Sequence, residues 1–454
     1  MKKEFNEKTF TMLAINYVIG FGFIATIVNV VELGYWGVLI FAITAFLAIT
    51  TALAFSRLVN AFPEDKGGSV AYAQRTNKKY LTFFTLFNQY IQSPLLSASG
   101  PLFLVKIAEV LNADETVLWI VRIISIVFFL VIIVISTFTL KTSKVLIFAS
   151  AAIKWSILAL GFGGLIYLVF VNPGSQSNII EDTKKINAYL IFSNIILFMF
   201  AFGGIEVVPN LANEVKFKNF KKVMMLAFMV IIAIYVLGYI LFINVDLKEN
   251  GSFVKIYKNS MGTFGVVAFS GYIIFYNFSS TLTSSISYPK ALVKFAEDGY
   301  LPKYLTKTNK HNQHKNAIWT HAVLIMMSMT IFTLIPTIFN LDGQAFDFVA
   351  TVGTIAFLLQ YVLTYVSALV LSKQKKITKI PIYEKIMYYV AALIIIVSTL
   401  IYFFPFLVNE KWTNQNTLAL VSYLGFFALA NIFYYSYRYK DTIKNHFIKA
   451  KKTK

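Results

Sequence analysis

Two ionisable residues lie deepest in the apolar stretches of the chain, Lys154 in AAIKWSIL and Glu206 in FAFGGIE. If these stretches cross a membrane, a charge at mid-depth costs at least about 2.5–3.5 kcal/mol, so such a residue is a functional candidate. Removing a lysine ammonium from water disfavours its charged form, so Lys154 can exchange a proton near neutral pH, and burial favours protonated Glu206. Each could instead form a structural hydrogen bond or ion pair between two helices.

Two apolar stretches contain glycine-rich segments that would break a helix and could form a binding site. VIGFGF (Val18 to Phe23) has two glycines, and FMFAFGGIEVVPN (Phe198 to Asn210) combines two glycines with Glu206 and Pro209. Paired interruptions in two halves are the best sequence pointer to a transporter site. Free N–H groups at one half-helix end suit a carboxylate and free carbonyls suit an ammonium group, so the breaks could hold a zwitterion. Alternatively, the glycines only allow close helix packing.

The elements that must position these residues are membrane-spanning helices. The 454-residue chain is 57% hydrophobic and 14% charged, which is too apolar for one soluble core. A span needs about 20 apolar residues. The sequence predicts twelve spans, with eleven as the alternative, over residues 11–33, 37–60, 82–110, 117–139, 145–171, 188–211, 221–244, 262–289, 317–340, 346–371, 386–408 and 416–438.

The basic residues predict the orientation of these spans. Most of the 41 Lys and Arg residues fall in segments that share one side of the membrane, as the positive-inside rule requires for cytoplasmic loops. We therefore predict a multi-pass protein of the cell (plasma) membrane with cytoplasmic N- and C-termini, residues 1–10 and the basic tail 439–454. The net charge of +20 then faces anionic lipids at the cytoplasmic face, and it indicates no nucleic-acid partner.

No cofactor or metal site is predicted. The chain has no cysteine, which excludes thiol catalysis and cysteine-ligated metals. It has no GxxxxGK[ST] loop for nucleotide phosphates, and its four histidines lack metal-ligand spacing. Because no nucleophile–base pair or metal cluster stands at membrane depth, we expect no enzyme activity.

Four motifs, in order along the chain, resemble those of the amino acid–polyamine–organocation transporter superfamily. VIGFGF is similar to its first-span IGSGIF motif, and FPEDKGGSVAYAQ (Phe62 to Gln74) to its proline-then-GG-then-aromatic pattern. FAFGGIE followed by ANEVKFKNF (Ala212 to Phe220) resembles its sixth-span signature and exit. SYPKALVKFAEDGYLPKYL (Ser287 to Leu305) resembles its loop after span eight.

The resemblance implies an all-α polytopic membrane protein with a 5+5 inverted repeat. The transporter core would cover residues 11–371, with repeats over about 11–171 and 188–371 and discontinuous helices 1 and 6. Two appended transmembrane helices would follow over 386–438. The implied function is secondary transport of amino acids or related amines by alternating access.

The resemblance also implies roles for particular residues. Backbone around Ile19, Gly20, Phe21 and Gly22 would meet the substrate carboxylate. The amino-group and side-chain region would be lined by residues of the sixth span, with Phe202 as an aromatic gate: Phe202, Gly203, Gly204, Ile205 and Glu206. Lys154 would replace a sodium ion, near carbonyls around Ile19 and hydroxyls of Ser280 or Thr283. This implies proton-coupled symport or amino-acid exchange.

Departures from the family pattern concern the substrate. Phe21 replaces the serine of IGSG and could narrow the pocket, and Phe220 replaces a usual proline. The predicted site residues are compatible with neutral, cationic or acidic amino acids as substrates. A carrier of polyamines or other organic cations is an alternative. A channel or a nutrient sensor on a transporter scaffold is a further alternative, although no pore-lining rings or soluble output domain are visible. The oligomeric state stays open.

Overall fold

The computed structural model describes residues 5–65, 68–111, 113–136, 140–174, 186–209, 215–216, 219–299, 301–310, 313–338 and 342–438. The predicted basic tail, 439–454, lies outside the described residues, as do residues 1–4 and 210–214.

The described chain is overwhelmingly helical, because apolar stretches in a membrane must satisfy their backbone groups internally. In chain order, the elements are β1 (Phe5–Asn6), α1 (Glu7–Val18), α2 (Phe21–Val31), α3 (Tyr35–Ala61), α4 (Ser69–Arg75), α5 (Lys79–Ser97), α6 (Ser99–Val110), α7 (Glu115–Ser136), α8 (Leu140–Val171), α10 (Ala188–Met199), η1 (Phe200–Phe202), β2 (Val215–Lys216), α11 (Phe220–Ile243), α12 (Leu247–Asn250), α13 (Phe253–Ser287), α14 (Pro289–Glu297), η3 (Lys303–Thr306), α15 (Lys315–Ile338), α16 (Asp342–Lys373), α17 (Ile382–Phe403), η4 (Pro405–Val408) and α18 (Asn414–Arg438).

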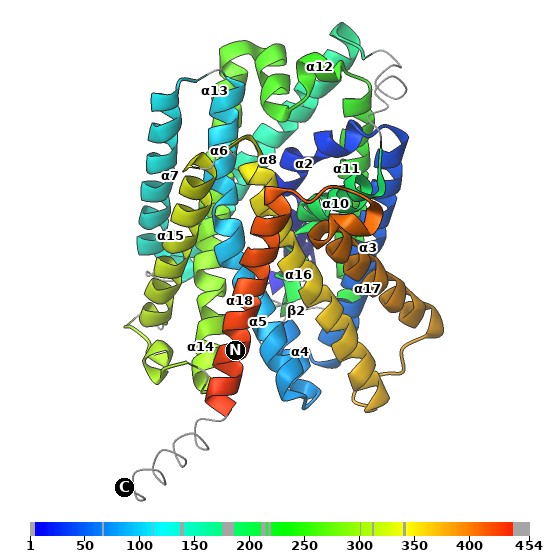
Figure 1. The fold of residues 1–454 in the computed structure, drawn as a ribbon, viewed down its shortest axis with the longest axis vertical. Coiled ribbons are helices and arrows are strands. Elements are labelled where there is room, and N and C mark those ends of the chain that lie inside the picture. Colours follow the sequence, from blue (N-terminus) through cyan, green and yellow to red (C-terminus); the bar gives the residue numbers. More distant parts are fainter. Residues whose placement is uncertain are drawn as a thin grey trace, which may run out of the picture.

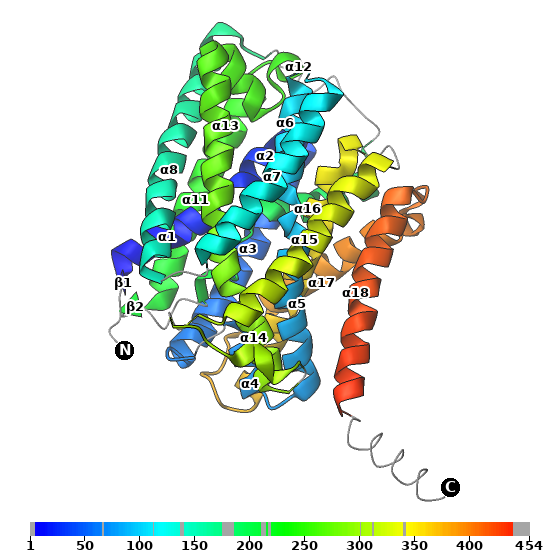
Figure 2. The same cartoon turned by 90° about the vertical axis from the view of Figure 1, so that its left-hand side faces the viewer.

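The long helices run side by side along the long axis of the molecule (Figures 1 and 2). Elements far apart in sequence lie side by side, since α13 packs along α8 and α16 packs along α5. In both views α4 and α14 lie at one end of the bundle and α12 lies at the other. Gln74 in α4 donates to Asp298 after α14 at 3.4 Å, so two of the family-like motifs meet at the same end.

Each of the twelve predicted stretches coincides with one helix or with a helix and its continuation. In the described part of the chain, seven single helices are long and apolar enough to cross a membrane. They are α3, α7, α8, α11, α13, α16 and α17, and the bent pair α1–α2 makes an eighth. The other stretches are interrupted or less apolar, so the count of twelve spans stays a prediction.

Both predicted breaks are present in the backbone. α1 and α2 are separate helices, bent by 52° relative to each other. α10 ends at Met199 and passes through η1 into non-helical turns at residues 203–207. The N-terminus of α1 is tied to the exit of the second break, because β1 and β2 pair in parallel with Phe5 opposite Val215.

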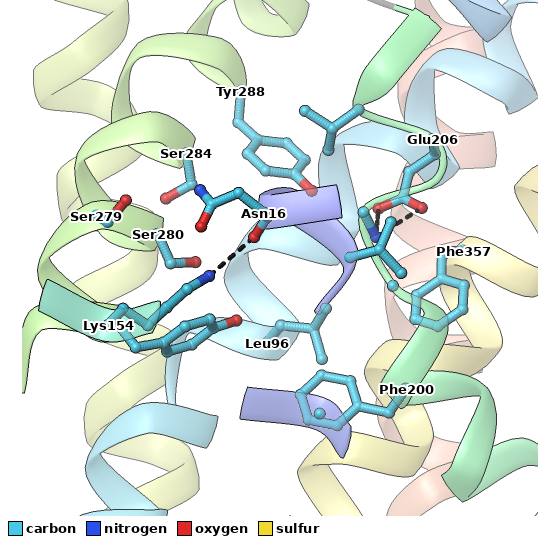
Figure 3. A pocket seen from close by; sticks show the side chains of 16 residues that line it. Asn16, Leu96, Lys154, Phe200, Glu206, Ser279, Ser280, Ser284, Tyr288 and Phe357 are labelled. Carbon is cyan, nitrogen blue, oxygen red and sulfur yellow. Dashed lines mark hydrogen bonds between the residues drawn. The ribbon is translucent and has the colours of Figure 1, made fainter. Parts of the chain in front are cut away.

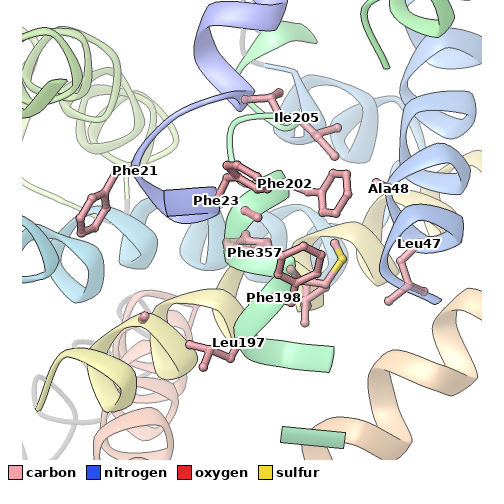
Figure 4. Packing of buried hydrophobic residues seen from close by; sticks show 14 of the residues in the cluster. Phe21, Phe23, Leu47, Ala48, Leu197, Phe198, Phe202, Ile205 and Phe357 are labelled. Carbon is pink, nitrogen blue, oxygen red and sulfur yellow. The ribbon is translucent and has the colours of Figure 1, made fainter. Parts of the chain in front are cut away.

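Aromatic side chains fill the core around the breaks (Figure 4). Phe23 in α2 stacks on Tyr235 in α11 with ring centroids 4.3 Å apart. Phe202 packs edge-on against Tyr235 at 5.2 Å and against Phe198 at 6.0 Å. All four side chains are fully buried. The unwound segments are therefore packed against buried aromatic rings.

Candidate functional site

The first break exposes backbone carbonyls that Lys154 binds. Lys154 Nζ, on α8, donates to Asn16 O at 2.9 Å and to Ile19 O at 3.0 Å. The last carbonyls of a helix have no partner within it, and the C-terminal end carries partial negative charge. Lys154 is only 2% exposed. Its ammonium group thus lies at a helix end where a cation is favoured. The predicted contact between Lys154 and a carbonyl near Ile19 is present.

The second break holds the carboxylate of Glu206. Its two oxygens accept from the Gly204 backbone N–H at 3.0 and 3.1 Å, and Oε2 accepts from the Tyr361 hydroxyl of α16 at 2.7 Å. Gly204 has φ of +106°, a conformation that side-chain-bearing residues rarely adopt. The glycine therefore allows the chain to turn so that its own N–H points at the carboxylate.

A cavity of about 150 Å³ lies between the two breaks. Figure 3 shows Lys154 and Glu206 on opposite sides of it. A water molecule occupies about 30 Å³ in the liquid, so the cavity has room for a small organic molecule. Its lining combines residues of both breaks with residues of α5, α8, α13 and α16: Asn16, Val18, Gly22, Leu96, Lys154, Phe200, Gly203, Gly204, Glu206, Val207, Tyr276, Ser279, Ser280, Ser284, Tyr288 and Phe357.

The structure brings six of the predicted site residues together at this cavity: Gly22, Lys154, Gly203, Gly204, Glu206 and Ser280. Ile19 takes part through its carbonyl. Gly20 lies beneath the wall, where a Cβ atom would be 2.6 Å from the Tyr276 ring. The side chain of Thr283 lies outside the described part of the chain.

Three predicted residues pack behind the lining. Phe202 and Ile205 are fully buried in the core. Phe21 is 1% exposed and touches Phe103, Phe200, Tyr276 and Phe346, with ring centroids 4.5–5.9 Å apart. A phenylalanine in place of the family's serine thus fills space beside the cavity and does not project into it.

Sequence reasoning missed several lining residues, above all Phe200. This ring, two residues before Phe202, is the η1 aromatic that lines the cavity. The serine-rich end of α13, SSTLTSSIS, was a signal for Ser279 and Ser284, since hydroxyls inside an apolar stretch tend to face a cavity. Nothing in the sequence pointed to Leu96, Tyr276 or Phe357, which reach the site from distant helices.

The two phenylalanines of η1, Phe200 and Phe202, should respond differently to truncation. Phe200→Ala should enlarge the cavity and shift selectivity toward larger substrates with little loss of stability. Phe202→Ala should destabilise the protein by about 3–5 kcal/mol, because it leaves a hole among packed rings. Thermal unfolding and substrate competition measured on both variants check this. The reverse pattern would show that Phe202, as the resemblance implies, faces the substrate.

A helical bundle whose two interrupted helices enclose a cavity with a buried lysine and a buried carboxylate is typical of membrane transporters. The family comparison agrees, since the model described as "Amino acid permease" matches residues 5–429. The chain belongs to this amino acid permease family and is a multi-pass membrane protein.

The chain aligns with its relatives over nearly their full length. The chain is 27% identical to the uncharacterized protein MG225 of Mycoplasma genitalium, over 97% of each chain. It is 27% identical to MG226 of the same organism, over 94% of each chain. Among solved structures, it is similar in fold to a mutant manganese transporter of Eremococcus coleocola, with a TM-score of 0.59, 12% identity and 94% of each chain covered.

Proposed function

We propose that this protein is a secondary active transporter that carries amino acids across the cell membrane by alternating access. The observation that carries the proposal is the cavity bounded by both helix breaks, with Lys154 bound to the carbonyls of the first and Glu206 folded into the second. Membership of the amino acid permease family supports amino acids as the substrate class.

The two breaks offer complementary groups to a zwitterion. The first N–H groups of α2, at Phe21 and Gly22, have no partner within the helix and favour a carboxylate. Gly22 lines the cavity directly. The turn at Gly203 and the Glu206 carboxylate also line the cavity and suit the amino group. The substrate side chain would then lie among Leu96, Phe200 and Phe357, which favours a modest apolar side chain.

Lys154 supplies the coupling in this proposal. While protonated, it holds Asn16 O and Ile19 O. When it loses its proton, a neutral amine binds these carbonyls less strongly, and α1 is free to move relative to α8. Ser280 lines the same cavity. In this proposal the hydroxyls of Ser280 and Thr283 belong to the proton-coupling site around Lys154. Proton-coupled symport or exchange follows, with the proton in the position of a coupling cation.

The proposed layout is a core of two inverted repeats, residues 11–171 and 188–371, followed by two appended helices over 386–438. Matching breaks in α1–α2 and after α10 support it. The basic segments around α4 and α14 lie at one end of the bundle, opposite α12, which supports a cytoplasmic location for that end and for both termini.

A ligand panel tests the proposed substrate class. We expect one or a few amino acids, at millimolar concentration, to raise the thermal unfolding midpoint of the purified protein, because a ligand that binds only the folded state stabilises it. Polyamines serve as the second arm. Stabilisation by polyamines alone would replace the amino-acid assignment with the organic-cation alternative, and stabilisation by neither class would contradict both.

A further inference from the structure

Tyr235 of α11 touches both helix breaks at once. Its hydroxyl donates to Ala201 O in η1 and lies 3.3 Å from Val18 O, the carbonyl of the last residue of α1. The side chain is fully buried. Ala201 and Val18 are far apart in sequence, so a single hydroxyl joins the ends of the two interrupted helices.

The ring of Tyr235 also contacts aromatic residues beside both breaks. It stacks on Phe23, which follows the first break, with an interplanar angle of 7°, and it meets Phe202, which precedes the second. One turn along α11, Gly238 makes room for Phe23, because a Cβ atom there would be 2.5 Å from Phe23 Cζ. The Tyr235 ring is therefore held between one ring beside each break, stacked on Phe23 and edge-on to Phe202.

Tyr235 and Lys154 bind different backbone carbonyls at the two breaks. Lys154 takes Asn16 O and Ile19 O, and Tyr235 takes Val18 O and Ala201 O. Adjacent carbonyls of the first break are thus bound by the coupling residue on one side and by Tyr235 on the other. A movement of α1 that follows deprotonation of Lys154 must pull on the Tyr235 contact and so on the second break.

We infer that Tyr235 is a positioning residue that transmits the movement of the first break to the second. It binds no substrate and stands outside the cavity lining. The inference rests on the proposed function, because it assigns Tyr235 a part in the transport cycle of that same site. The hydroxyl, not the ring, makes the link.

Tyr235→Phe keeps the ring stack and removes only the link. Its matched control is Tyr257→Phe, since Tyr257 is also buried and also donates its hydroxyl to a backbone carbonyl, Ile157 O, which belongs to the uninterrupted helix α8. We expect the exchange rate of labelled amino acid in proteoliposomes to fall about tenfold in Tyr235→Phe and to stay near wild type in Tyr257→Phe, with similar thermal midpoints.

A second readout does not depend on transport. Because the chain has no cysteine, spin labels can be placed through Met12→Cys on α1 and Ile382→Cys on α17, both more than two-thirds exposed. We expect a broader distance distribution in Tyr235→Phe than in Tyr257→Phe. If Tyr235→Phe fails to fold, Tyr235→Met, which also removes the hydroxyl, takes its place with the same expectations, and Tyr257→Met is its control.

The inference requires both effects. Equal exchange rates and equal distance distributions in the two variants would overturn it, and so would either effect without the other. If the wild-type protein exchanges no amino acid, the proposed function fails, and the distance distributions alone then decide whether Tyr235 holds the two breaks together.

Discussion

Lys154→Ala should abolish the accumulation of substrate that a pH gradient drives. Lys154 is the buried cation that binds Asn16 O and Ile19 O, and alanine can neither bind these carbonyls nor carry a proton. Without it, α1 loses the contact whose making and breaking we propose as the coupling step. We expect uptake into proteoliposomes to become independent of the pH difference across the membrane, with loss of concentrative uptake as the measured effect.

The control for Lys154→Ala is Lys222→Ala, which removes an exposed lysine near the start of α11. Lys154→Met, which retains most of the side-chain volume, separates the loss of charge from the loss of packing. Both variants at position 154 should fail, and Lys222→Ala should accumulate substrate as the wild type does. Undiminished proton-driven uptake by Lys154→Met would remove Lys154 from the coupling mechanism.

Gly22→Ala should disable the binding site through the backbone. A Cβ atom on Gly22 would lie 2.3 Å from Phe200 O, 2.7 Å from Phe200 C and 3.0 Å from Ala201 Cα. These are backbone atoms of the second break, which cannot rotate away as a side chain does. The two breaks would have to separate, so we expect exchange to fall at least about 100-fold and stability to fall by about 1–3 kcal/mol.

Gly163→Ala is the matched control for this glycine, since nothing lies within 4 Å of the added Cβ atom and the residue belongs to the continuous helix α8. It should leave both exchange and unfolding temperature near wild type. Wild-type exchange by Gly22→Ala would mean that the breaks do not pack against each other during transport, contrary to the site described above.

The sequence predicted the helical elements and the two breaks well, because apolar length and glycine position are local signals. It also predicted that Lys154 meets a carbonyl near Ile19. It named Phe202, whereas Phe200 lines the cavity, because η1 and the turns after it do not follow α-helical periodicity and the facing of the two rings depends on tertiary packing; the gate role of Phe202 stays a prediction. The partners Tyr235 and Tyr361 come from other helices, and no local pattern indicates such contacts.

The number of spans and the relationship between the two repeats depend even less on local sequence signals. α5 and α6 meet at a break around Ala98, and α13 is kinked at Gly262, whose φ is +60°. Such interruptions leave the apolar composition of a stretch unchanged while altering the path of its helix. The correspondence between residues 11–171 and 188–371 therefore remains part of the proposal.

Counterflow in proteoliposomes tests the central claim most directly. Vesicles containing the purified wild-type protein are loaded with an unlabelled amino acid that stabilises it, diluted into a trace of the labelled form, and sampled over time. A carrier predicts transient accumulation of label above the external concentration, because outward movement of unlabelled substrate drives inward movement of label. Equilibration without overshoot would indicate a channel, and no entry of label would contradict transport of that amino acid.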